Sequence, residues 1–244
     1  MKPVVPDAWS ALRRHTPARI ALGRAGASLP TREVLQFGLA HARARDAVHQ
    51  ALDFTRLKSE LERAGYLPAL VRSAAADRQT YLTRPDLGRR LGAQTDLRGD
   101  AEIVIAIEDG LSAIAVQTHA APLLRELQSM NEERWKGVPV VVALQGRVAL
   151  GDEIGERMKA KLVVVLIGER PGLSSPDSLG IYITYAPRVG RTDAERNCIS
   201  NVRPEGLRYG EAARRLDWLA SAALARGLTG VGLKDESVPL ADHS

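Results

Sequence analysis

The side chains of this sequence that could do chemistry gather between residues 168 and 203. Cys198 is the single cysteine, and Arg191 and Arg196 precede it closely, so their positive charges could favour a thiolate nucleophile. A lone cysteine is more often a small, inert apolar side chain. Glu169 could bind a ligand through its carboxylate, or could form a salt bridge with a neighbouring arginine, Arg147 or Arg170.

Several well-known catalytic patterns are missing. No G-x-G-x-x-G follows a strand-like segment, and no P-loop, His-Glu-x-x-His or G-x-S-x-G motif occurs. Ser174 and Ser175 have no histidine near them in the sequence, so a hydrolase would need a distant partner. One cysteine excludes an internal disulfide and a zinc site built on cysteines, which fits a reducing cytoplasm. We therefore predict no metal site.

The segment that must position these residues starts with a change in composition. Residues 162–167 are all apolar and mostly β-branched, which predicts a strand buried on both faces. Residues 168–180 then hold three glycines, two prolines and three serines, which favour a specific loop. Such a loop could be an ordinary exit from a strand. Because open α/β sheets bind ligands at the carboxyl ends of their strands, we prefer a ligand site.

The rest of the chain divides into two regions. We predict that residues 1–98 form an N-terminal, mainly helical domain, with helices at 31–49 and 54–64 and a third short one. We predict that residues 99–244 form a Rossmann-like α/β domain with a doubly wound, mostly parallel sheet. Its expected strands are 103–107, 139–144, 162–167, 181–184 and 230–233, and its main helices are 112–128 and 210–226.

The loops that follow the expected parallel strands should meet, because the carboxyl ends of such strands lie at one edge of a sheet. These loops are residues 108–110, 145–148 and 168–172. We expect the ligand to bind where they gather.

Charge and composition limit the kinds of partner that the chain can bind. The 244 residues carry a net charge of +5, and residues 1–100 alone carry +7, with 17 Lys/Arg against 10 Asp/Glu. Aromatic residues make up only 4%, which is too few for base stacking, so we predict no nucleic-acid binding. The longest apolar runs, six or seven residues, fall far below the roughly 20 that span a bilayer. We expect Val4, Val5, Trp9 and Leu12 to form a short docked segment.

Three longer motifs carry a resemblance. They are Gln145-Gly146-Arg147-Val148 with the residues to Gly155, Gly168-Glu169-Arg170-Pro171-Gly172 with its flanks, and Arg196-Asn197-Cys198-Ile199-Ser200 with its flanks. In these motifs, and more broadly from about residue 16 to 235, the sequence resembles the small (light) subunit of ethanolamine ammonia-lyase. That family enzyme depends on adenosylcobalamin and converts ethanolamine to acetaldehyde and ammonia.

The resemblance implies a hetero-oligomer. In the family, the large subunit is a barrel that carries the substrate and most catalytic groups, and the small subunit closes over the corrin ring. The family's cofactor contacts carry over to Val148, Glu169 and Cys198. The resemblance implies that this chain has no catalytic residue and that the enzyme is active only with the large subunit. It also implies a cytoplasmic location, with packaging in a bacterial microcompartment.

The chain lacks Asp-x-His-x-x-Gly, whose histidine replaces the cofactor's own base on cobalt in some cobalamin enzymes. We therefore expect adenosylcobalamin to bind base-on. Two alternatives remain open. The chain could be a stand-alone α/β enzyme that binds a nucleotide at the same edge, or a purely structural subunit that touches no cofactor.

Overall fold

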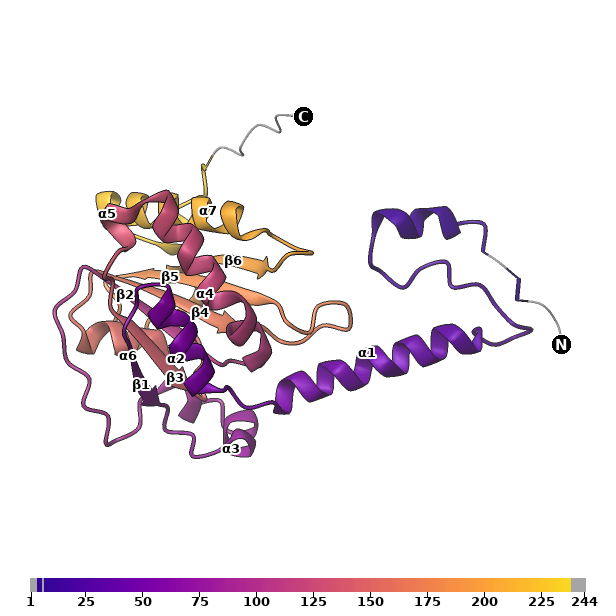
Figure 1. Cartoon of the computed structure of the whole chain (residues 1–244), viewed down its shortest axis with the longest axis horizontal. Coiled ribbons are helices and arrows are strands. Elements are labelled where there is room, and N and C mark those ends of the chain that lie inside the picture. Colours follow the sequence, from indigo (N-terminus) through magenta and orange to yellow (C-terminus); the bar gives the residue numbers. More distant parts are fainter. Residues whose placement is uncertain (1–3, 6, 238–244) are drawn as a thin grey trace.

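A computed structural model describes residues 4, 5 and 7–237, and a six-stranded sheet forms its centre (Figure 1). The strands are β1 (Pro68–Arg72), β2 (Ile103–Glu108), β3 (Val140–Leu144), β4 (Leu162–Gly168), β5 (Leu179–Tyr185) and β6 (Arg196–Val202). Their order across the sheet is β1-β3-β2-β4-β5-β6. The first four are parallel, and β5 runs antiparallel to both β4 and β6. The prediction of an α/β fold with a mostly parallel sheet is confirmed.

Helices connect and flank the strands. The α-helices are α1 (Thr31–His49), α2 (Phe54–Arg63), α3 (Arg78–Thr83), α4 (Ala113–Met130), α5 (Glu132–Trp135), α6 (Leu150–Arg157) and α7 (Tyr209–Arg226). Short 3-10 turns are η1 (Ser10–His15), η2 (Leu87–Arg89), η3 (Asp193–Glu195) and η4 (Gly230–Gly232). The helices predicted from the 3.6-residue periodicity and the flanking turn residues are therefore present.

The two faces of the sheet are covered to different extents. Helices α2, α4 and α7 supply Leu57, Leu123 and Leu216 to a large core on one face. On the other face, α6 packs Leu150 and Ile154 against β2, β3 and β4 in a smaller core. Of β5 and β6, only Tyr182 packs against this smaller core among the described residues. Part of the β5–β6 face therefore lies open beside α6.

Three elements differ from the sequence-based expectation. The sheet starts earlier than expected, since β1 lies within the region expected to be helical and pairs with β3. Strand β6 was not predicted, and the strand expected at 230–233 is instead the 3-10 turn η4. Gly230 explains the last difference: its φ is +80°, and a Cβ there would lie 2.1 Å from the carbonyl oxygen of Ala194. The division into domains 1–98 and 99–244 stays a prediction.

The described residues before residue 50 form an arm that extends away from the sheet (Figure 1). Within α1, only Ala47 is buried. Trp9 is 68% exposed, and Val4, Val5 and Leu12 are also exposed. The prediction of a docked N-terminal segment is therefore wrong at these four residues, since the body of the chain does not cover them.

Candidate functional site

The three predicted loops meet at the carboxyl edge of the sheet. The amide of Leu111 donates to the carbonyl oxygen of Gly168 over 2.9 Å, and the amide of Gly146 donates to Asp109 Oδ1 over 3.1 Å. The approach at Gly168 requires glycine, because a Cβ there would lie 2.0 Å from the carbonyl oxygen of Ser112. The expected gathering of these loops is confirmed, and main chain closes the edge between β2 and β4.

Glu108, the last residue of β2, fills the space beneath the start of α6. A Cβ on Gly146 would lie 2.9 Å from Glu108 Oε2, and a Cβ on Gly151 would lie 3.6 Å from Oε1. Neither carboxyl oxygen has a hydrogen-bond partner among the residues described. Burial, followed by the charges of Asp109 and Asp152, raises the pKa of Glu108 well above its usual value. A helix start can attract a phosphate, but the Glu108 side chain occupies the space there, which argues against a nucleotide site at this edge.

The open face of β5 and β6 lies beside this closed edge, and Tyr182 is at its centre. Ile181 and Ile183 point into the large core, so the alternation of a strand turns Tyr182 to the opposite face. Tyr182 pairs in register with Cys198 of β6. Cys198 is exposed, and its Sγ lies 3.3 Å from Ser200 Oγ. Small side chains thus surround a half-buried aromatic ring.

Glu169 borders the same face. Its carboxylate accepts hydrogen bonds from the hydroxyl of Ser178 and, over 3.3 Å, from the amide of Asn201. A Cβ on Gly180 would lie 3.1 Å from the Glu169 side chain, so the glycine gives the carboxylate its room. The alternative interpretation was a salt bridge from Glu169 to Arg147 or Arg170. No such ion pair occurs in the described part of the chain.

Val148 completes the group. It lies in the loop that precedes α6, and it packs against the smaller core as Tyr182 does. Both side chains line a cleft of about 750 Å³. Burial, and then the neighbouring Cys198 and Glu169, raise the pKa of Tyr182, so the phenol stays neutral at physiological pH. The structure thus brings all three sequence-predicted residues around Tyr182.

Sequence reasoning missed Tyr182 as the common neighbour of these residues. Its signal was present, because Gly180, Tyr182 and Thr184 alternate with the apolar residues of β5. That alternation shows which residues share a face. It does not show that Cys198 lies beside Tyr182, because that depends on the pairing of β5 with β6.

Arg196, at the start of β6, joins this strand to β5 and to α6. Its guanidinium is buried and donates to Asp152 Oδ2 of α6 over 2.7 Å and to Thr184 Oγ1 over 3.0 Å. The charge that could have activated Cys198 is therefore neutralised by Asp152. The nucleophile interpretation of Cys198 gains no support from this geometry.

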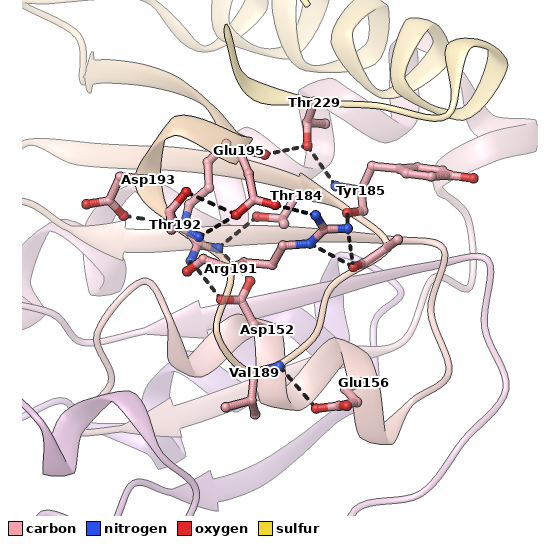
Figure 2. A network of polar contacts seen from close by, with 12 residues as sticks. Asp152, Glu156, Thr184, Tyr185, Val189, Arg191, Thr192, Asp193, Glu195 and Thr229 are labelled. Carbon is pink, nitrogen blue, oxygen red and sulfur yellow. Dashed lines mark hydrogen bonds and ion pairs between the residues drawn. The ribbon is translucent and has the colours of Figure 1, made fainter. Parts of the chain in front are cut away.

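The loop between β5 and β6 forms one wall of the cleft. Its side chains take part in a network of polar contacts (Figure 2). Arg191 pairs with Glu195 and donates to the carbonyl oxygen of Tyr185 over 3.2 Å. The amide of Val189 donates to Glu156 Oε2 of α6 over 3.2 Å, which ties the loop to that helix. This network joins the loop to β5 and to α6.

The described residues contain neither a membrane-spanning helix nor a metal-binding cluster. Across residues 4, 5 and 7–237, no helix combines the length and the apolar character needed to cross a membrane. The same part of the chain holds no group of three or more His, Cys, Asp or Glu side chains that could bind a metal ion.

Comparison with known proteins gives a family. Residues 6–234 match the family model described as "Ethanolamine ammonia-lyase light chain (EutC)". The chain is 56% identical over 241 residues to the ethanolamine ammonia-lyase small subunit of Xanthomonas campestris pv. campestris, covering 95% of this chain and 89% of that protein. It is 57% identical over 245 residues to the protein of the same name from Azotobacter vinelandii, covering 96% and 91%.

A third relative, from Pseudomonas aeruginosa, carries the same name and is 55% identical over 248 residues, covering 96% of this chain and 91% of its own. The family match spans nearly the whole chain and includes the loops and strands of the cleft. The chain therefore belongs to the ethanolamine ammonia-lyase light chain family.

Proposed function

We propose that this chain is the small subunit of an adenosylcobalamin-dependent ethanolamine ammonia-lyase, which converts ethanolamine to acetaldehyde and ammonia. Its partner is the large subunit, and its own part is to hold the corrin ring against that partner. One observation carries the proposal. Val148, Glu169 and Cys198, the residues that match the family's cofactor contacts, come from three separate segments and meet around Tyr182 on an open sheet face.

The chemistry of this face fits a corrin. A corrin is a broad apolar disc with amide side arms, so it needs a flat contact surface and a few placed polar groups. Tyr182, Cys198 and Val148 supply contact area on this face. Glu169 Oε2 accepts the two hydrogen bonds described above, and Oε1 accepts none from the described residues, so it can accept one from an amide arm.

When bound, adenosylcobalamin supplies the radical chemistry that no protein side chain offers. This chain binds the ring, fixes its orientation and keeps water from one side of it. No side chain around Tyr182 is required to move a proton, so we expect no turnover from the isolated chain. We place the assembly in the cytoplasm, and we extend the proposal to its packaging in a bacterial microcompartment.

A tryptophan at Cys198 tests the site directly. In the complex with the large subunit, Cys198→Trp should weaken adenosylcobalamin binding about tenfold or more, because a bulky ring overpacks the contact surface. Cys198→Ala is the matched control and should bind nearly as the wild type does. Spectral titration of both complexes measures the affinities. If the complex with Cys198→Trp assembles and keeps wild-type affinity, the chain is a purely structural subunit instead.

The cofactor's own base should stay on cobalt. We expect the electron paramagnetic resonance spectrum of the cob(II)alamin state of the complex to show splitting from the nitrogen of that base, tested with cofactor labelled at the base nitrogens. Loss of the splitting would mean that a protein side chain has replaced the base, contrary to the proposal.

A further inference from the structure

The cleft beside Tyr182 is rich in arginine. Its lining includes the arginines Arg89, Arg90, Arg147, Arg191 and Arg196, against the carboxylates of Asp86 and Asp193. Val148 and Tyr182 belong both to the lining of the cleft and to the face proposed to hold the corrin, so the cleft adjoins that face. A volume of about 750 Å³ suits a ligand fragment larger than a simple ion.

Three of these arginines are already neutralised. Arg90 lies 3.1 Å from Glu153, and Arg191 and Arg196 pair with Glu195 and Asp152. Their charges are bound within the wall and floor of the cleft. They contribute little to the attraction of a further anion.

Arg147 keeps unused binding capacity. One of its terminal nitrogens donates to the carbonyl oxygen of Tyr81 over 2.9 Å, and its guanidinium lies 4.5 Å from the centre of the Tyr81 ring. Its Nε is buried and has no hydrogen-bond partner in the described part of the chain. No carboxylate among those residues lies within 4.0 Å of its guanidinium. The stacked ring thus holds a guanidinium whose Nε has no acceptor within the described residues.

Arg89 is the second arginine without a carboxylate partner. It is exposed at the end of η2, and within residues 7–237 no ion pair to it occurs. The amide of Arg147 donates to the carbonyl oxygen of Gly88 over 2.9 Å, so the two arginines lie on segments bonded to each other. Asp86, the nearest acid on that segment, pairs with Arg84 over 2.7 Å.

We propose that Arg89 and Arg147 bind the phosphodiester of the cofactor's nucleotide tail, in the cleft that continues from the corrin face. This inference rests on the proposed function. A phosphodiester carries one negative charge and several acceptor oxygens, which match the fork of an arginine, and charge-assisted hydrogen bonds of this kind are strong. The position also agrees with a base-on cofactor, whose tail extends from one side of the ring.

The test compares two corrinoids. Adenosylcobalamin has the nucleotide tail, and cobinamide has the same ring without the phosphodiester, ribose and base. Both are titrated spectrally into the complex with the large subunit, carrying the wild-type chain, Arg89→Gln or Arg89→Lys. Arg63→Gln on α2, across the sheet from the cleft, is the matched control for loss of one positive charge.

We expect Arg89→Gln to weaken adenosylcobalamin binding about tenfold and to leave cobinamide binding unchanged. Arg89→Lys should recover part of the loss, and Arg63→Gln should bind as the wild type does. Equal effects of Arg89→Gln on both corrinoids, or no effect on either, would overturn the inference. If the wild-type complex binds neither corrinoid, the proposed function fails, and the inference fails with it.

A free nucleotide is the other source of the same phosphate chemistry. ATP is therefore tested by equilibrium dialysis against the same complexes, and we expect no binding that depends on Arg89. ATP binding that Arg89→Gln abolishes while adenosylcobalamin affinity stays at the wild-type value would assign the cleft to a nucleotide and overturn the inference.

Discussion

Replacement of Arg196 by methionine is expected to lower the free energy of unfolding by about 3–5 kcal/mol. The side chains of Arg196 and Asp152 are only 2% and 1% exposed, so the substitution leaves a carboxylate buried without its partner. It also removes the hydrogen bonds from Arg196 to Thr184 Oγ1 and to the carbonyl oxygen of Arg191, which join β5, β6 and the wall of the cleft. Urea denaturation of the purified chain measures the loss.

Two further variants separate the buried pair from the loss of a charge in general. Arg98→Met removes an exposed arginine that pairs with Asp96, and it should change stability by less than about 1 kcal/mol. The double variant Asp152→Leu with Arg196→Met leaves no charge uncompensated and should recover much of the loss. A small effect of Arg196→Met, similar to that of Arg98→Met, would contradict the buried ion pair.

The sequence was informative wherever a local pattern determines the structure. The apolar run 162–167 became β4, and the periodic segment 210–226 became α7. The turn residues after β4 predicted the loop that carries Glu169. These elements depend on burial and on backbone preferences that each segment carries in itself.

The elements that sequence analysis missed depend on distant partners. Strand β6 begins with the polar residues Arg196 and Asn197, whose partners are Asp152 on α6 and the main chain at Gly230 and Leu233. A polar strand of this kind does not show the apolar alternation that predicts strands. Strand β1 begins at a proline and lies at the sheet edge, where its pattern is weak.

The position of the site shows the same limit. Sequence analysis expected the ligand at the carboxyl edge, and the motifs there do contribute Val148 and Glu169. The edge itself is closed by the contact between Leu111 and Gly168 and is filled by Glu108. The open surface lies beside it, on β5 and β6. Helix α6 reaches these strands at one end, where Asp152 binds Arg196, and the neighbouring Cys198 of β6 stays exposed. The packing of α6 against strands distant in the sequence therefore decides which surface is available.

Glu108→Gln is expected to stabilise the chain at neutral pH, by an amount that grows with pH. The folded chain holds Glu108 protonated well above its usual pKa of 4.5, because burial and the nearby Asp109 and Asp152 disfavour its charge. The positive charge of Arg196, and then the amide of Gly151, oppose this rise in pKa without reversing it. In the unfolded chain the same carboxyl ionises near 4.5. Between the two pKa values, unfolding therefore releases a proton.

A rise in pH consequently favours the unfolded wild-type chain, and its stability falls by about 1.4 kcal/mol per pH unit above the unfolded pKa, until the folded pKa is reached. Glutamine has nearly the same shape as the protonated acid and does not titrate, so the variant escapes this loss. Urea denaturation at pH 5, 6 and 7 should show the difference between variant and wild type widening at each step. Glu133→Gln, at an exposed position, supplies the control for the replacement of a glutamate by glutamine. A difference for Glu108→Gln that stays constant with pH would mean that Glu108 is ionised in the folded chain, and the space beneath α6 would then need a cation or water to balance it.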